Sequence, residues 1–192
     1  MSTGLIVILI VVLLIVLCVG YFISVQRNIV STDEYCQNAM SQISVQLNSR
    51  WDAVMSLAKI AAQYAKHESE TLINVIQQRR MGEVTNAQQA NEQQDAISNV
   101  MSRIMAIGEA YPDLKADSLY KETMDGIRDY EEKVRMSRMV YNDTATKYNR
   151  IIRQFPSSMI ASMLGYRDLK EYLKVDEDKK TSYPNLDDAF KN

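Results

Sequence analysis

The single histidine of this sequence is the residue best suited to acid–base chemistry. His67 is followed by two carboxylates, Glu68 and Glu70, and a histidine near a carboxylate can act as a general base. Together with Lys66, however, these residues form one polar stretch, which is more typical of the solvated face of a helix. A serine nucleophile would need a context such as Gly-x-Ser-x-Gly, which the sequence lacks. We therefore predict no enzyme and no catalytic residues, and a hydrolase that uses His67 is the weakest alternative.

Metal and cofactor chemistry is disfavoured by the residue types. A di-iron site in a helical bundle needs a Glu-x-x-His pair from each of two helices, but His67 is alone and Tyr64 stands three positions before it. Zinc needs several His or Cys ligands, whereas Cys18 lies in an apolar segment and Cys36 stands alone. This separation also argues against an internal disulfide. The glycines are scattered singly, so the sequence has no phosphate-binding loop. We predict no metal site and no cofactor.

Two Tyr-Asn pairs are the most regular feature among the polar residues. Tyr141-Asn142 and Tyr148-Asn149 are seven residues apart and therefore face the same way on one helix. The favoured interpretation is that both rings fill a core seam while their hydroxyls reach its edge, because no basic groove accompanies them. The alternative is a stacking platform for a ligand or a peptide. The candidate interaction or packing residues are Trp51, Tyr111, Pro112, Tyr141 and Tyr148.

The eleven methionines permit a similar pair of interpretations. Those predicted on buried stripes are Met40, Met124 and Met163. Those predicted to lie off the stripes, or at their margins, are Met55, Met105, Met136, Met139 and Met159. Because methionine side chains adapt to varied surfaces, this excess suits a surface that binds a partner.

An uncharged apolar segment, residues 5–25, precedes the first charged residue, Arg27. A helix of about 20 apolar residues crosses the hydrocarbon core of a membrane, so we predict a retained transmembrane helix. A signal peptide would have a basic residue before a shorter core, and a lipid-modified Cys18 would follow a small residue rather than Leu17. Arg27 on the carboxyl side favours an N-terminus outside and a cytoplasmic domain, by the positive-inside rule.

The charges of the chain nearly balance, with a formal net charge of −2. The longest basic runs are Arg79-Arg80 and Lys179-Lys180, which are too short to form an electrostatic footprint for nucleic acid. We therefore predict no nucleic-acid partner.

The rest of the chain has the periodicity of long amphipathic helices. No Gly or Pro occurs between Gly20 and Gly82, so the anchor and the first soluble helix are predicted to form one rod that ends near Arg79. Its apolar stripe recurs at steps of three and four and comprises Cys36, Met40, Ile43, Leu47, Trp51, Val54, Ala58, Ala61 and Ala65. The glutamine-rich residues 86–95 could be disordered, but we favour a solvated helix. That helix carries Ala90, Ile97, Val100, Ile104 and Ile107.

Residues 111–117 predict a turn, with Asp117 or Ser118 as the N-cap of a third helix over residues 119–155. Its predicted stripe comprises Tyr120, Met124, Ile127, Tyr130, Val134, Ser137, Tyr141, Thr144, Tyr148, Ile151 and Phe155. Pro156 ends it, and a fourth helix is predicted over residues 158–173. The fold class is therefore all-α, an N-terminal transmembrane helix that continues into an antiparallel helical bundle with long helices. The expected parts are a short N-terminal segment (1–4), the transmembrane helix (5–25), the bundle domain (26–174) and a polar, disordered tail (175–192).

Several blocks follow one another in the order found in a known family. They are Gln42-Ile-Ser-Val-Gln-Leu-Asn-Ser-Arg-Trp-Asp52, Tyr64-Ala-Lys-His-Glu68, Glu109-Ala-Tyr-Pro-Asp-Leu-Lys-Ala116, Arg138-Met-Val-Tyr-Asn142, Tyr148-Asn149 and Phe155-Pro156. Together they resemble the LemA family of bacterial membrane-anchored helical proteins. The resemblance implies a helical bundle with a translocated N-terminus, no clear enzymatic activity and no cofactor. One departure is Val54-Met55-Ser56-Leu57, where the family usually has a Pro-Asn-Leu step, so the kink that Pro would impose is expected to be absent.

These observations favour a non-enzymatic scaffold in the bacterial cell membrane. Its expected partners are the lipid bilayer, further copies of itself and other membrane proteins. The alternative is a sensor or regulator that binds a small ligand between helices, with Tyr141 and Tyr148 lining the site.

Overall fold

A computed structural model describes residues 3–65 and 84–174, and every regular element in them is a helix. The helices are α1 (Thr3–Tyr64), α3 (Ala87–Ala110), α4 (Pro112–Ala116), α5 (Ser118–Arg153) and α6 (Ser157–Met163). No strand occurs in these described ranges, and the predicted all-α fold is confirmed. His67 and the predicted C-terminal tail lie outside the described residues.

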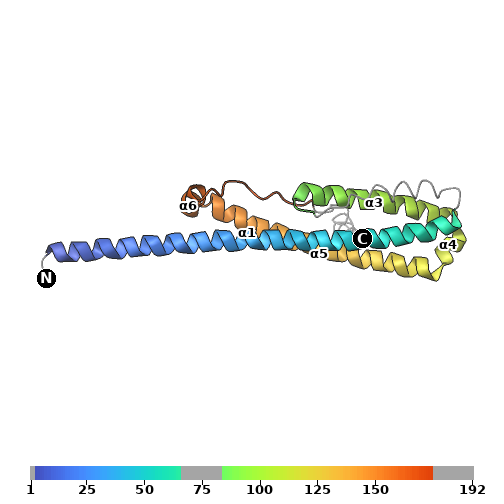
Figure 1. Ribbon diagram of the computed structural model, residues 1–192, viewed down its shortest axis with the longest axis horizontal. Helices are drawn as coiled ribbons and strands as arrows, with labels where there is room; N and C mark the ends of the chain where they lie inside the picture. Colours follow the sequence, from blue (N-terminus) through green and yellow to red (C-terminus); the bar gives the residue numbers. More distant parts are fainter. Residues whose placement is uncertain (1–2, 66–83, 175–192) are drawn as a thin grey trace, which may run out of the picture.

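Helix α1 joins an exposed apolar segment and a buried amphipathic segment in one rod (Figure 1). It contains 62 residues, which corresponds to about 93 Å at 1.5 Å per residue. The apolar side chains before Val25 are exposed or half-buried, whereas all the predicted stripe residues from Cys36 onward are buried. The predicted continuity of anchor and bundle is confirmed. By length and composition alone, α1 is the one helix of the described residues that could cross a membrane.

The predicted end of the first helix is wrong, because α1 ends at Tyr64. The Tyr64 hydroxyl donates a 2.6 Å hydrogen bond to Asp117 Oδ2, in the loop before α5. The prediction depends on a run of residues without Gly or Pro. Such a run does not indicate a contact between residues 53 positions apart. Helix α1 does pass without a break through Val54 and Leu57, both buried, where the resemblance would have placed a Pro-Asn-Leu step.

The glutamine-rich stretch is helical, as favoured, and forms the start of α3. Asn86 caps it, since its side-chain oxygen accepts a 2.9 Å hydrogen bond from the backbone N–H of Gln89, which satisfies one of the free donors of the first turn. The predicted turn over residues 111–117 is instead the short helix α4. Pro112 occupies its first turn, where the ring fixes a helical φ and the missing N–H costs nothing.

Helix α5 begins where the sequence predicts. The carboxylate of Asp117 accepts hydrogen bonds from the backbone N–H groups of Leu119 and Tyr120, as an N-cap does. In the second half of the predicted stripe Val134, Tyr141 and Tyr148 are buried as predicted. The three positions between and after them are one residue early, since Arg138, Ala145 and Ile152 are buried rather than Ser137, Thr144 and Ile151. Phe155, predicted to end the stripe, is 79% exposed. The error arises because a hydrophobic pattern does not anticipate an arginine in the core.

The predicted fourth helix is also wrong over most of its length. Helix α6 stops at Met163, and Gly165 follows with a φ of 87°. The N–H of Gly165 bonds to the carbonyl of Ser162, and the N–H of Tyr166 bonds to the carbonyl of Ala161. These are the two hydrogen bonds of a Schellman motif, which ends helices at a left-handed glycine. Residues 166–174, which we call the strap, continue without regular secondary structure.

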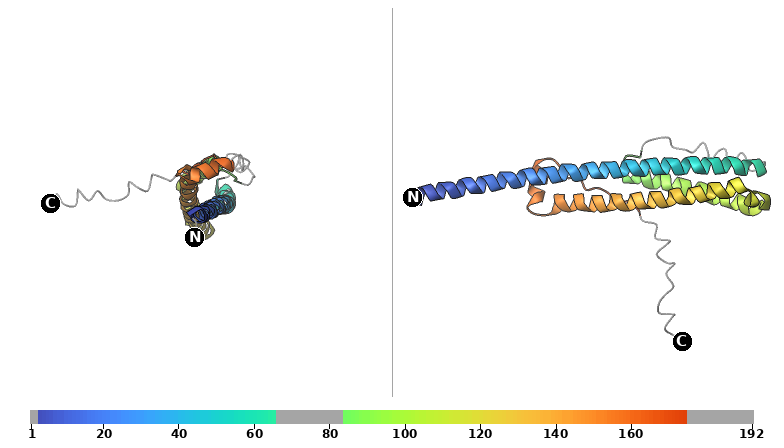
Figure 2. Two further views of the ribbon diagram at one scale, coloured as in Figure 1. Left: turned by 90° about the vertical axis from the view of Figure 1, so that its left-hand side faces the viewer. Right: turned by 90° about the horizontal axis from the view of Figure 1, so that it is seen from below.

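The bundle has two unlike halves along its length. Helix α5 runs antiparallel to α1 along most of the bundle, as predicted, whereas α3 runs parallel to α1 (Figure 1). We call the half in which α3, α4 and the start of α5 lie beside the C-terminal part of α1 the distal half. In the other, proximal half, nearer the N-terminus of α1, α6 packs beside α1 and the strap runs from α6 toward the start of α3 (Figures 1 and 2). The strap thus takes the place that α3 occupies in the distal half.

Candidate functional site

Two asparagines on α5 hold the backbone of the strap. Asn149 Oδ1 accepts from the N–H of Lys170 at 2.8 Å, and its Nδ2 donates to the carbonyl of the same residue at 2.9 Å. Asn142 does the same at Leu173, with distances of 2.9 and 3.1 Å. We call Asn142 and Asn149 the asparagine ladder. Each amide thus satisfies both polar groups of one strap residue, as a neighbouring strand would do in a sheet.

The spacing of the ladder matches that of an extended chain. Seven residues of helix rise about 10.5 Å, and three residues of extended or polyproline backbone cover about 9–10 Å. Asn149 and Asn142 both reach the strap from α5, so the backbone polar groups of Lys170 and Leu173 face the same side of the strap. An extended segment therefore presents its polar groups to Asn149 and Asn142 in register.

The far end of the strap is held by two further side chains. The backbone N–H of Lys174 donates to Asn91 Oδ1 on α3 at 3.4 Å, and its carbonyl accepts from Arg138 Nη1 at 3.2 Å. Arg138 Nη2 also reaches Asn91 Oδ1 at 3.5 Å. Arg138 is buried, and a buried guanidinium needs such acceptors to offset the loss of water. The strap therefore ends at the junction of α3 and α5.

Side chains of the strap add contacts to those of its backbone. Leu173 is 2% exposed and enters the core. The Lys170 ammonium lies 2.6 Å from Asp33 Oδ1 on α1 and 5.1 Å from the centre of the Tyr148 ring, a geometry that combines an ion pair with a cation–π contact. The outward-facing Leu169 is about half exposed. The Tyr172 hydroxyl also accepts a 3.3 Å hydrogen bond from Asn149 Nδ2. The strap is thus held by its backbone, with Leu173, Lys170 and Tyr172 as side-chain anchors.

The strap covers a seam between α1 and α5, which we call the groove. The side chains in this groove are shielded from water. Burial raises the pKa of the Tyr148 hydroxyl to about 12, with smaller contributions from Asp33 and other groups. Burial also raises the pKa of the Cys36 thiol, an effect that Lys170 opposes and Asp33 reinforces. Cys36 is 2% exposed. Both shifts favour the neutral forms, so these side chains serve packing while the strap is in place.

A hollow of about 420 Å³ lies beside the strap. It is lined by Cys36, Gln37, Met40, Thr85, Asn86, Ala87, Gln88, Tyr141, Leu169, Lys170 and Glu171. Its walls come from α1, the start of α3, α5 and the strap. Tyr141 thus reaches a space large enough for a small molecule, and Tyr148 is not among the residues that line this hollow.

The distal half has its own buried arginine. Arg50 on α1 donates to Gln94 Oε1 on α3 at 3.0 Å and to Glu131 Oε2 on α5 at 3.3 Å. It therefore ties all three long helices together. Trp51 is 2% exposed beside it, and within the described part of the chain its indole Nε1 has no hydrogen-bond acceptor. This cluster lies within the helix seam, and its residues line neither the hollow beside the strap nor an open hollow beside Arg27.

The predicted candidate residues fall in separate places. Trp51, Tyr141 and Tyr148 are buried along the seam, Tyr111 is half-buried, and Pro112 is exposed at the start of α4. Among the methionines, Met40 is buried and Met55 and Met124 are half-buried, but Met163, predicted on a stripe, is 77% exposed because α6 ends there. Those exposed outside the stripes are Met105, Met136, Met139 and Met159.

Sequence reasoning missed the residues that hold the strap. The sequence shows the Tyr-Asn repeat, but the prediction assigns its function to the tyrosine rings and not to Asn142 and Asn149. The available signal was an asparagine repeated after seven residues beside the predicted core stripe. An amide that becomes buried there needs hydrogen-bond partners from another segment. Nothing in the sequence around Arg138 or Asn91 indicated their shared contact with Lys174.

The side chains that contact the strap backbone are suited to hydrogen bonding. Those that bind the strap backbone are the amides of Asn91, Asn142 and Asn149 and the guanidinium of Arg138, which do not titrate near neutral pH. Among the described residues, no group of three or more His, Cys, Asp or Glu side chains could hold a metal ion. The site is suited to hold an extended polypeptide.

Comparison with known proteins finds relatives that match part of the chain and a family that matches most of it. The magnetosome protein MamQ of Magnetospirillum gryphiswaldense is 29% identical over 76 residues, which are 40% of this chain and 28% of that protein. Magnetosome protein MamQ 2 of Paramagnetospirillum magneticum is 30% identical over 71 residues, which are 37% of this chain and 26% of that protein. The match thus spans about a quarter of the length of these relatives. Residues 39–187, most of the chain and most of its bundle, match the LemA family, and the chain belongs to this family.

Proposed function

We propose that this chain is a membrane-anchored, non-enzymatic scaffold that assembles with further copies of itself by exchanging straps. The single observation that carries the proposal is the asparagine ladder, which holds an extended segment through its backbone. The apolar segment of α1 supplies the anchor, and Arg27 at its carboxyl end favours a cytoplasmic bundle.

A second copy is the partner that fits the groove best. The groove already accepts the sequence of this strap, so the strap of another copy makes the same contacts. Exchange of an identical element costs little, because the bonds lost in one chain are regained in the other. The connection from α5 to the strap, residues 154–165, has the seven residues of α6 as its one helix and ends at the left-handed Gly165, so it is a small element to lift away.

Site-directed crosslinking between two copies tests the exchange. In a background of Cys18→Ser and Cys36→Ala, one full-length chain carries Asp33→Cys and a second, differently tagged chain carries Lys170→Cys. These positions are in contact in the closed chain, so a short bis-maleimide can join them across two chains only if the strap of one copy lies on the other. We expect a covalent heterodimer after the two proteins are mixed in detergent and returned to vesicles.

Matched variants separate exchange from mere proximity. Adding Asn142→Ala and Asn149→Ala should remove the heterodimer, whereas Asn38→Ala and Asn99→Ala, at exposed positions, should leave it. A chain that carries both cysteines reports the closed form as an internal crosslink. If that internal crosslink forms and the heterodimer never does, the strap does not exchange and the proposal is wrong.

The hollow beside Tyr141 supports a second candidate function, a sensor that binds a small ligand next to the strap. A ligand there would touch Leu169 and Lys170 and would therefore report on the position of the strap. Soaking the reconstituted protein in a metabolite mixture, followed by mass spectrometry of the washed protein, tests this function. Retention that is lost in Tyr141→Ala and kept in Tyr111→Ala would support it.

A further inference from the structure

Three large apolar side chains are exposed together at the proximal end of the bundle. Phe155, Met159 and Met163 are 79%, 60% and 77% exposed. Met159 and Met163 lie four residues apart on α6 and so share one face, while Phe155 stands at the junction between α5 and α6. We call these three residues the end cluster. The opposite side of α6 is packed, because Ile160 and Ala161 are buried.

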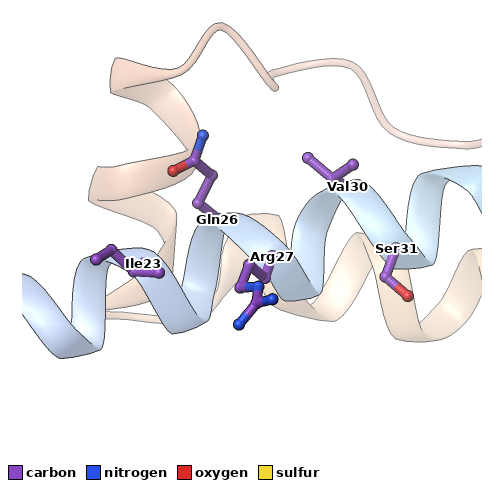
Figure 3. Close-up of a pocket in the computed structure, with 5 residues that line it drawn as sticks. All are labelled: Ile23, Gln26, Arg27, Val30 and Ser31. Atoms are coloured by element: carbon purple, nitrogen blue, oxygen red, sulfur yellow. The ribbon is translucent and has the colours of Figure 1, made fainter.

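The end cluster lies at the level where the exposed part of α1 meets the bundle. Helix α6 contacts α1, and the views in Figures 1 and 2 place it at the end of the bundle nearest the N-terminal segment of α1. Figure 3 shows Ile23, Gln26 and Arg27 on the part of α1 at this end of the bundle. The first charged residue, Arg27, follows directly. A membrane crossed by the preceding apolar residues therefore has its interface at this level.

The same end of the molecule is basic. Arg27 on α1, Arg150 and Arg153 in the last turn of α5, and Arg167 at the start of the strap are all exposed. Neither residues 1–32 nor residues 150–167 contain an Asp or a Glu. Arg27 also lines an open hollow of about 500 Å³ with Ile23, Gln26, Val30 and Ser31 (Figure 3).

An apolar face with arginines at its rim is the pattern of a segment that lies in a membrane interface. Apolar side chains enter the boundary between headgroups and acyl chains, and arginines are attracted to anionic headgroups. We infer that the end cluster inserts into the interfacial layer of the membrane that α1 crosses, with these arginines beside the phosphates of anionic lipids. The inference rests on the proposed membrane anchor. This second contact fixes the tilt of the bundle, which a single crossing helix would leave free.

Depth-dependent fluorescence quenching tests the insertion. The full-length chain is reconstituted into vesicles of phosphatidylcholine and phosphatidylglycerol that carry bromine either near the headgroup or near the end of the acyl chain. Met163→Trp reports on the end cluster, Leu14→Trp on the apolar segment of α1, and Met136→Trp on an exposed site in the middle of α5. The buried Trp51 gives the same background in all three variants.

We expect the shallow bromine to quench Met163→Trp and the deep bromine to quench it less. The deep bromine should quench Leu14→Trp, and neither should quench Met136→Trp. An unquenched Met163→Trp beside a quenched Leu14→Trp would overturn the inference and leave the anchor intact. If both stay unquenched, the anchor itself fails, and the inference fails with it.

The contribution of the arginines has its own measurement. Adding Arg153→Gln and Arg167→Gln to Met163→Trp should lower the shallow quenching about two-fold in anionic vesicles and leave it unchanged in pure phosphatidylcholine. Lys121→Gln, at an exposed position at the other end of α5, is the matched control. Equal quenching with and without the two arginines would show that anionic lipid does not draw the end cluster to the interface.

Discussion

The distal and proximal halves of the bundle differ in what covers the seam between α1 and α5. In the distal half a third helix, α3, covers the seam between α1 and α5 with buried Ile97, Val100 and Ile104. In the proximal half the strap covers the seam with one buried apolar side chain, Leu173, and is held by hydrogen bonds from side chains to its backbone. Apolar burial contributes far more stability than hydrogen bonds exchanged with water. The proximal half is therefore the part that can open while the distal half stays folded.

The largest expected effect is on the distal half. Leu57→Ala removes a fully buried side chain, and truncation of a core leucine costs about 2–5 kcal/mol. We expect this loss in the free energy of unfolding, measured by denaturant titration with circular dichroism in detergent. Ser56→Ala, at the exposed neighbouring position, should change it little. Equal effects of the two substitutions would contradict the assigned burial of this seam.

Loss of the asparagine ladder should open the proximal half alone. The reporter is Cys36, whose thiol is buried beneath the strap, in a Cys18→Ser background. Each lost pair of hydrogen bonds leaves buried groups unsatisfied at about 1–3 kcal/mol, so Asn142→Ala with Asn149→Ala should raise the rate of Cys36 alkylation at least about ten-fold.

The global unfolding midpoint should move less in the ladder variant than in Leu57→Ala. The control is Asn38→Ala with Asn99→Ala, for which we expect no faster alkylation. If the ladder variant loses stability everywhere at once, the two halves fold as one unit and the contrast between them is wrong.

Alkaline pH should weaken the proximal half through Tyr148. Its pKa in the folded protein is raised to about 12 by burial, above the value of about 10 in an unfolded chain. Stability from the neutral hydroxyl is thus fully present below pH 10 and is lost as the pH rises from about 10 toward 12. Protection of Cys36 in the wild-type chain should therefore fall over this range more steeply than in Tyr148→Phe. Parallel curves for the two proteins would exclude this contribution.

Acid should produce the smallest effect, at the distal end. The hydrogen bond from Tyr64 lowers the pKa of Asp117, and backbone N–H groups of α5 add to the effect. A lowered pKa contributes stability above the unfolded value of about 4, and this stability is lost as the pH falls below that value. The Tm of Asp117→Asn should therefore lie below that of the wild type at neutral pH, with a difference that shrinks on acidification. A constant difference would mean that the charge of Asp117 plays no part.

The sequence by itself determined the helical elements of this protein. The run without Gly or Pro and the apolar steps of three and four predicted the rod α1 and its buried face, because helix periodicity is a local property. Asn86 and Asp117 act within three residues of their own positions, so their capping functions were also within reach. The asparagine spacing in α5 was visible, but its partners were not.

Only the tertiary structure decided what covers the proximal seam. The ladder bonds join residues 21 and 31 positions apart, and the Arg50 contact with Glu131 spans 81. Such contacts depend on the direction of α3 and on the end of α6, neither of which hydrophobic periodicity encodes. An arginine or asparagine becomes a core residue only when a distant segment supplies its hydrogen-bond partners. For this reason the sequence predicted a fourth helix where the fold has a strap.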